Sequence, residues 1–445
     1  MGGPFLTKRT MHHRLTSTAA IAAATVALVA LSATTAAAAE TPWYFSALKL
    51  DAGAAEGFTG DGVTIAVIDG QINPEVPALV GANLDIHEPS FCYGDDGEPV
   101  PATSTELSLT KPTDHGTNVV SMIAGTGSGY DGQSGITGVA PGAKILYYSV
   151  YTSSSDEGAL SCLDDGGVPV TQLGEAMDAA IDDGADIISV SLSMGANGAF
   201  VDAAARAFRE GVVVLGSLSN SSELEITGGM PGVANGAISV QAAAADGQVQ
   251  GTDGVPNRNF LTDIVAPGLG FTLQGDRATG QWSDQFEADG TSLATPLAAG
   301  VIALAMEKYP DATGNQIIQS VIHNTSGEPD HDPALDPDEL IGYGLISVTN
   351  LMGTDPSKYD DVNPLIQEVE GPNDALIPTY EEIFAAEPEA DAPAPDPADD
   401  APAEQGLPGW IWVLLAGLAV VVVVVIIVVV LVVRKRPSSS PSNSH

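Results

Sequence analysis

Basic residues are scarce in this sequence. Fifteen Lys and Arg stand against 57 Asp and Glu in the 445 residues, which gives a formal net charge of −42 at pH 7. Such an excess of negative charge repels phosphate backbones and anionic lipid surfaces. It argues against nucleic acid as a partner and against adhesion of an exported domain to anionic lipid, and it favours solubility.

The patterns of a metal site are also missing. No HExxH pair is present, which argues against a zinc protease. The acidic segments 131–135 and 330–339 do not match a calcium loop, and we interpret them as solvated loops. No internal repeat is found either. We therefore expect no metal and no other cofactor.

Two long apolar runs lie near the ends of the chain, and the first belongs to residues 1–39. This segment begins with basic side chains, continues as an Ala/Val/Leu run over 19–31 and ends in small residues, which is typical of a signal peptide cleaved near Ala39. A transmembrane anchor is the alternative. The run is shorter than the ~18–20 residues that a span needs, so cleavage is favoured.

The second apolar run predicts a transmembrane helix over residues 409–433. From position 410 onward it carries no charge, and a helix of this length, about 36 Å, can cross a ~30 Å hydrocarbon core. Trp410 and Trp412 suit the outer interface, and the basic residues that follow mark 434–445 as a cytoplasmic tail. We expect a single-pass protein of the cell membrane with an extracellular main domain.

The remaining chain divides into a domain and a spacer. Residues 355–408 contain a stretch dominated by Pro, Ala and acidic residues, which predicts an extended, self-repelling linker. Residues 40–354 are numerous enough to form one well-buried domain.

Cysteine occurs only at positions 92 and 162. An even count in an exported protein favours one disulfide between Cys92 and Cys162, which would stabilise the fold by roughly 4 kcal/mol through loop closure. Two free, buried thiols are the alternative.

The domain alternates apolar runs with helical patterns. Nearly continuous apolar runs predict buried strands, and periodic segments between them predict helices over 171–184 and 199–211. This order indicates an α/β fold with a mostly parallel sheet, right-handed crossovers and helices on both faces, in which active sites lie at the carboxyl ends of strands. The runs that predict strands are 62–69, 143–151, 186–194, 211–218 and 237–243.

One serine stands between a small turn and an apolar segment with helical spacing, in "FEADGTSLATPLAAG" over 286–300. Thr291 or Ser292 could simply cap that helix, with Pro296 in its early turns. A nucleophilic role for Ser292 needs a histidine, a carboxylate and oxyanion donors.

Candidates for these partners occur elsewhere in the chain. Asp69 ends an apolar run as "VIDG", His115 lies in "DHGT" at the expected start of a helix that Thr113 or Asp114 could cap, and Asn220 follows an apolar run in "SLSN". Each could instead be structural: a turn aspartate, a partly buried histidine and a loop asparagine.

Together these motifs resemble the subtilisin-like serine proteases. The order "VIDG", "DHGT", "SLSN" and "GTSLATP", with "SLSMG" over 191–195 and further motifs, runs from about residue 60 to residue 351. The order Asp, His, Ser also differs from that of α/β-hydrolases. The resemblance implies a three-layer subtilisin-like fold and a serine endopeptidase acting on polypeptides.

The resemblance also implies a role for each residue. Ser292 would attack the peptide carbonyl, His115 would transfer its proton, and Asp69 would orient the imidazole. The Asn220 amide and the Ser292 backbone N–H would bind the oxyanion. The substrate-binding residues would be Ser191, Leu192, Ser193 and Ser219.

Several positions depart from the family pattern. "VIDG" lacks the usual Ser or Thr between Asp and Gly, and Ser193 and Ser219 replace glycines beside the primary pocket; Asp289 and Leu293 also differ from the residues usual in the serine motif. The hydroxymethyl groups at 193 and 219 predict a narrow pocket for a small residue.

The architecture as a whole resembles the mycosins, which are membrane-anchored subtilases attached to type VII secretion systems in actinobacteria. A signal peptide, a Pro-rich linker, one anchor, a basic tail and the short stretch before Asp69 carry this resemblance. It implies an enzyme linked to protein secretion, with a secretion complex as a partner. The alternative is a non-catalytic scaffold of the same fold that braces such a complex.

Overall fold

The computed structural model describes residues 1–2, 42–50, 56–154, 160–221, 229–368 and 377–384. These residues belong to one compact unit that ends at Ala385. The predicted signal peptide, the acidic stretch 385–408, the predicted span 409–433 and the tail 434–445 lie outside the described residues, apart from residues 1–2. No helix among the described residues is long and apolar enough to cross a membrane.

A seven-stranded parallel sheet forms the centre of this unit, which confirms the predicted α/β class. The spatial order β13-β10-β9-β8-β1-β5-β2 departs from chain order, as crossover connections through helices require. Its strands are β1 (Thr64–Asp69), β2 (Leu84–Ile86), β5 (Lys144–Ser149), β8 (Ile187–Val190), β9 (Val213–Ser217), β10 (Ile238–Ala243) and β13 (Ile264–Pro267).

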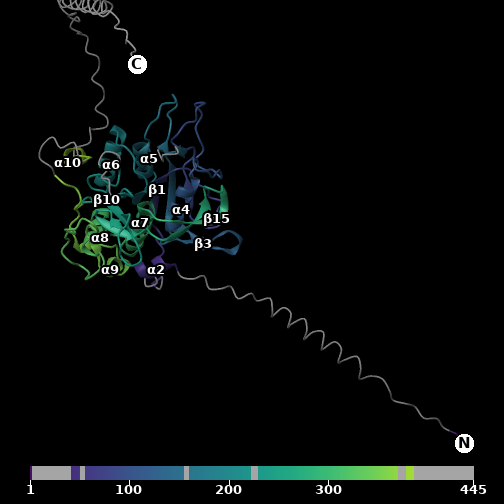
Figure 1. The fold of residues 1–445 in the computed structure, drawn as a ribbon. Coiled ribbons are helices and arrows are strands. Elements are labelled where there is room, and N and C mark those ends of the chain that lie inside the picture. The colour runs from purple at the N-terminus through teal and green to yellow at the C-terminus, as the bar shows by residue number, and fades with distance from the viewer. Residues whose placement is uncertain (3–41, 51–55, 155–159, 222–228, 369–376, 385–445) are drawn as a thin grey trace, which may run out of the picture. The chain divides into compact units, whose positions relative to one another are not determined.

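Helices cover both faces of the sheet (Figure 1). The helices on one face are α4 (Thr113–Ala124), α7 (Thr291–Lys308) and α8 (Gly314–His323); those on the other are α5 (Leu173–Asp182) and α6 (Gly198–Glu210). Shorter helices are α2 (Trp43–Leu48), α9 (Val348–Gly353), α10 (Tyr380–Phe384) and the 3-10 turns η1 (Tyr130–Gly132) and η2 (Pro356–Lys358).

The strands supply side chains to two separate cores. Along β1, Ile65 and Val67 face the core under α4 and α7, whereas Ala66 and Ile68 face the core under α5 and α6. Successive side chains of a strand point to opposite faces, so a strand buried on both sides must be apolar throughout. This is the physical reason for the continuous apolar runs in the sequence.

Among the described residues, four two-stranded sheets lie outside the main sheet, and the longest is a hairpin that packs against α4. The pairs are β3 (Thr126–Ser128) with β4 (Ser134–Thr137), β6 (Ser153–Ser154) with β7 (Leu160–Ser161), β11 (Gly251–Thr252) with β12 (Val255–Pro256), and β14 (Phe271–Asp276) with β15 (Gln281–Ala288).

The folded unit continues past residue 354, the boundary expected from composition. The helix α10 packs on α6, where Ile383 is fully buried and Arg209 donates to the carbonyls of Glu382 and Ile383 at 3.2 and 3.3 Å. A single apolar side chain can dock a short helix without giving the surrounding segment an apolar composition. Polar composition therefore does not mark the end of the folded domain here.

Candidate functional site

The carboxyl edge of the sheet brings the predicted site residues together. Asp69 is the last residue of β1, and His115 lies in the first turn of α4. Asn220 follows β9 by three residues, and Ser292 is the second residue of α7. Parallel strands end at one edge of the sheet, and helices that lead the chain back along the sheet begin at the same edge. Residues at strand ends and at helix starts therefore converge there.

Both helix starts differ in detail from the expectation. Pro112 occupies the N-cap position of α4 and Gly290 that of α7, and neither helix has a side-chain cap. Thr291 is the first residue of α7, so its side chain is not placed to cap it. Its hydroxyl instead donates to the carbonyl of Leu218 at 2.6 Å, which joins α7 to the segment after β9.

Asp69 and His115 form a close pair. The Nδ1 atom of His115 lies 2.9 Å from Oδ1 and 3.0 Å from Oδ2 of Asp69. The carboxylate is fully buried, whereas 23% of the histidine side chain is exposed. A buried acceptor on Nδ1 fixes this nitrogen as the N–H donor and leaves Nε2 as the base.

The electrostatic surroundings raise the pKa of His115. Burial of the ring lowers the pKa, but the charge and hydrogen bond of Asp69 raise it more. Arg277 lowers it and Asp114 raises it by smaller amounts. These two are themselves paired, because Nε of Arg277 donates to Oδ1 of the buried Asp114 at 2.6 Å.

Asn220 is tied to the first residue of α7. Its Oδ1 atom accepts the backbone N–H of Thr291 at 2.9 Å and lies 3.2 Å from the hydroxyl of the same residue. This contact satisfies one of the N–H groups that a helix start leaves unpaired. It also directs the side-chain NH₂ of Asn220 away from the helix, so that this group can donate to a ligand.

Gly290 leaves room for the serine. A Cβ atom at this position would lie 3.1 Å from Oγ of Ser292, which is a tight contact, and 3.6 Å from Oδ1 of Asn220, which is an ordinary one, so a side chain would crowd the serine. Pro296 lies inside α7 past the first turn, so it has no N–H for the helical hydrogen bond to the carbonyl of Ser292 four residues earlier.

One cleft of about 470 Å³ contains nearly all of the predicted site residues. Asp69 is the exception, because it lies buried behind the His115 ring. The lining residues are His115, Ser191, Leu192, Ser193, Ser217, Leu218, Ser219, Asn220, Ser221, Thr291 and Ser292. Ser191 is 4% exposed, and its Oγ has no partner among the described residues. The cleft is thus rich in hydroxyl groups and open to a polar chain.

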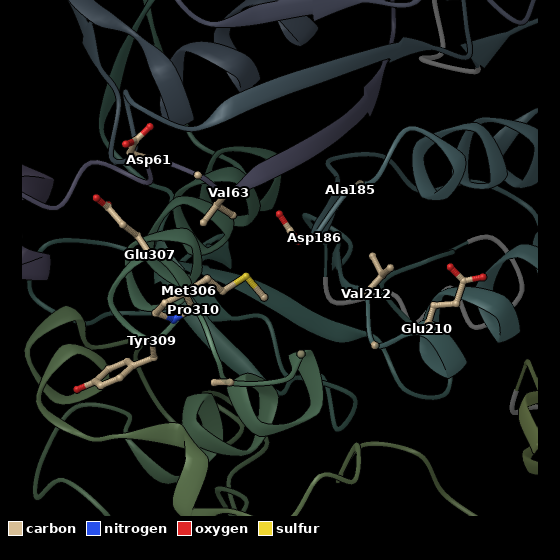
Figure 2. A pocket seen from close by; sticks show the side chains of 14 residues that line it. Asp61, Val63, Ala185, Asp186, Glu210, Val212, Met306, Glu307, Tyr309 and Pro310 are labelled. Atoms are coloured by element: carbon tan, nitrogen blue, oxygen red, sulfur yellow. The ribbon is translucent and has the colours of Figure 1, made fainter.

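A second cavity, of about 270 Å³, lies at the opposite edge of the sheet (Figure 2). It contains carboxylates but none of the predicted site residues. Glu307 accepts the backbone N–H groups of Thr59 and Gly60, and Asp186 accepts that of Thr64. These two carboxylates hold backbone in place at the amino ends of the strands.

Sequence reasoning missed three residues around the Asp69–His115 pair. The hydroxyl of Tyr151 lies within hydrogen-bond distance of Asp69. Arg277 contacts Asp114 in the same way, and the hydroxyl of Tyr147 contacts the carbonyl of Gly70. The only signal in the sequence was the glycine directly after Asp69, since a position without a side chain can accommodate a bulky neighbour.

The two cysteines form a disulfide in the structure. It joins two short hairpins with similar sequences, "CYGDDGEPV" and "CLDDGGVPV". In each hairpin the N–H of the last valine, Val100 or Val170, donates to the carbonyl of the cysteine. The hairpins also contact each other, because the N–H of Tyr93 donates to Leu163 at 2.9 Å. Neither hairpin supplies a residue to the cleft.

Comparison with known proteins identifies the family. Residues 60–344, more than half of the chain, match the model of the Subtilase family. Subtilisin Savinase of Lederbergia lenta is 28% identical over 316 residues, which cover 69% of this chain and 96% of that protein. A thermostable alkaline protease of Halalkalibacterium halodurans is 27% identical, with 68% of this chain and 72% of that protein covered.

Solved structures agree on the fold. A protease of Pseudoalteromonas arctica superposes with a TM-score of 0.51 at 22% identity, covering 69% of this chain and 93% of that one. Fervidolysin of Fervidobacterium pennivorans superposes with a TM-score of 0.50 at 23% identity, covering 73% of this chain and 46% of that one. The chain belongs to the Subtilase family, and it is a subtilisin-like serine endopeptidase.

Proposed function

We propose that Ser292 is the nucleophile of this endopeptidase, with His115 as its general base and Asp69 as the residue that orients His115. The contact of Asp69 with Nδ1 of His115, in a cleft that also contains Ser292, supports this assignment most strongly. Ser292 would attack the scissile carbonyl as its proton passes to Nε2 of His115. The imidazolium would then give that proton to the leaving amine.

The oxyanion would be bound by Asn220 and by the start of α7. The side-chain NH₂ of Asn220 and the backbone N–H of Ser292 are the proposed donors. The side-chain oxygen of Asn220 already accepts the N–H of Thr291, which leaves the NH₂ group for the oxyanion. The positive end of the α7 dipole adds to their effect.

Substrate would lie along the residues after β8, with Ser191, Leu192 and Ser193 forming main-chain hydrogen bonds to an extended peptide. We propose that the primary pocket selects a small residue, because side chains at Ser193 and Ser219 occupy space beside the cleft. Hydrolysis of peptides that differ only in the residue before the scissile bond measures this preference.

The wider role that we propose is mycosin-like. The apolar segment 409–433 would anchor the enzyme in the cell membrane with the catalytic domain outside, next to a protein secretion complex. The composition of the sequence ends and of the acidic linker supports this proposal. The alternative wider role is that of a scaffold of the same fold that braces such a complex, and the serine side chains at 193 and 219 are the observation in its favour.

One labelling experiment tests both proposals. A membrane-impermeant fluorophosphonate, added to intact cells that produce the full chain, should label the wild type in the membrane fraction and leave the Ser292→Ala variant unlabelled. Ser217→Ala, which removes another hydroxyl of the same cleft, is the matched control and should still be labelled. Labelling only after lysis would refute the orientation. No labelling of the folded, purified wild type would support the scaffold.

A further inference from the structure

We infer that Tyr151 is a positioning residue for the reaction: its hydroxyl donates to the Asp69 carboxylate, in a space that exists because residue 70 is glycine. The hydroxyl oxygen lies 3.3 Å from Oδ1 of Asp69, and the same Oδ1 accepts the backbone N–H of Gly70 at 2.7 Å. This oxygen is also one of the two that contact His115. The inference rests on the proposed role of Asp69 and His115.

The pairing of β1 with β5 brings Tyr151 to this place. Asp69 is aligned with Ser149, the last residue of β5, and the N–H of Val150 continues the ladder by donating to the Asp69 carbonyl at 2.8 Å. Tyr151 follows directly and is only 2% exposed. The backbone that carries Tyr151 is therefore fixed to the backbone that carries the carboxylate.

Gly70 makes the contact possible. A Cβ atom at this position would lie 2.3 Å from Cζ of Tyr151 and 2.7 Å from both Cε atoms, which is far inside the contact distance. Any other residue at position 70 would displace the ring. The sequence "VIDG" has no hydroxyl side chain directly after the aspartate, and the tyrosine supplies a hydroxyl to the carboxylate from the neighbouring strand instead.

The tyrosine can act only as a donor under working conditions. Burial, followed by the nearby charge of Asp69, raises the pKa of Tyr151 well above its ordinary value. The phenol therefore keeps its proton at neutral and alkaline pH. A protonated hydroxyl beside a carboxylate donates its hydrogen to it, because the carboxylate has only acceptors to offer.

A donor on Asp69 changes the basicity of His115 in a definite direction. The Tyr151 hydrogen bond disperses negative charge on Oδ1, so removing it strengthens the attraction between Asp69 and a protonated His115. The pKa of His115 should then rise further. The other titratable or charged groups around the pair are Asp114 on α4, Tyr147 on β5 and Arg277 in the β14–β15 turn.

The test measures how fast a fluorophosphonate labels Ser292 in the full chain as a function of pH. Phosphonylation requires neutral His115, and it can be measured without knowing the natural substrate. Tyr151→Phe keeps the ring and loses the donor. Its plateau rate should fall about 3- to 10-fold, as expected for the loss of one hydrogen bond of ordinary strength, and the acid limb of the profile should move to higher pH.

Tyr147→Phe is the matched control. Tyr147 is a fully buried tyrosine of β5, but its hydroxyl donates to the carbonyl of Gly70 at 2.7 Å, and no bond to the carboxylate is lost with it. The acid limb of this variant should match that of the wild type. A Tyr151→Phe profile equal to that of Tyr147→Phe, or a slower rate with an unmoved acid limb, would overturn the inference and leave Tyr151 a packing role.

A second pair of variants tests the dependence on Gly70. Gly70→Ser alone should slow labelling because its Cβ displaces the Tyr151 ring. Combined with Tyr151→Ala, the serine has room and offers a hydroxyl beside Asp69, so the double variant should label faster than Tyr151→Ala alone. If the fold-losses in labelling rate of the two single variants simply multiply in the double variant, the proposed coupling is contradicted. A wild type that is not labelled at all would refute the proposed catalytic role instead.

Discussion

At the scale of single residues, the side chains of the cleft divide into the proposed nucleophile and the groups that support it. Asn220 illustrates the proposal, because the oxygen of its side-chain amide is bound within the fold and the NH₂ group is the proposed oxyanion donor. The oxygen accepts the N–H of Thr291, which fixes the orientation of the group in advance. An oxyanion donor that is already oriented needs no rearrangement in the transition state.

Asn220→Ala should therefore impair turnover far more than binding. We expect kcat to fall by roughly 10²–10³ and KM to change little, since the donor acts on charge that develops only in the transition state. Steady-state hydrolysis of a peptide substrate measures both constants. Asn257→Ala removes the donor to the Asn220 backbone carbonyl and serves as a control that leaves the amide side chain intact. Equal losses in both variants would point to a disturbed loop.

Among the secondary-structure elements, the strands of the sheet are also joined by side chains. Asp263, directly before β13, accepts the backbone N–H of Ser239 on β10 at 2.8 Å and its hydroxyl at 2.9 Å. Burial raises the pKa of Asp263 to about 7 despite these hydrogen bonds. The folded protein thus binds a proton on this carboxyl that the unfolded chain releases near pH 4.

This raised pKa predicts a pH-dependent stability. The contribution of Asp263 to the free energy of unfolding is fully present below about pH 4 and is lost as the pH rises to about 7. The reason is that this carboxyl ionises at lower pH in the unfolded chain than in the folded protein. Asp263→Asn should remove this decline. Urea unfolding from pH 4 to pH 8 measures it, with the exposed turn residue Asp246 replaced by Asn as the control. Parallel pH curves for Asp263→Asn and the wild type would contradict the prediction.

The secondary structure was predictable because its periodicities are local. The runs for β1, β5, β8, β9 and β10 and the patterns for α5 and α6 all correspond to elements of the structure, with ends shifted by a few residues. The helix starts were less predictable. A cap depends on the conformation of one residue. Pro112 takes this position in α4, where Thr or Asp was expected, and Gly290 takes it in α7, where Thr or Ser was expected.

At the scale of the whole molecule, the disulfide fastens two hairpins beyond the carboxyl end of β5. The bond connects Cys92 with Cys162, 70 positions apart. A cross-link over such a span restricts the unfolded chain more than the folded one. Its main effect is therefore expected on stability, because the cleft has no residue from either hairpin.

Reduction should lower the melting temperature by on the order of 5–10 °C and leave the labelling of Ser292 in the folded protein nearly unchanged. Binding of long peptides should respond more than labelling, since only a long chain could reach the hairpins. Thermal unfolding of the Cys92→Ser/Cys162→Ser variant is the control for side effects of the reductant. Two free thiols in unreduced peptides, seen by mass spectrometry, would contradict the pairing.

The sequence by itself determined the class of fold, the order of the family motifs and the segments that we assign to export and anchoring. All of these depend on composition or on local spacing. Only the tertiary structure decided what surrounds Asp69 and His115. Tyr151 reaches Asp69 across 82 positions, and Arg277 reaches Asp114 across 163. No local pattern encodes such contacts, because they depend on which strands pair and on how a hairpin packs against α4.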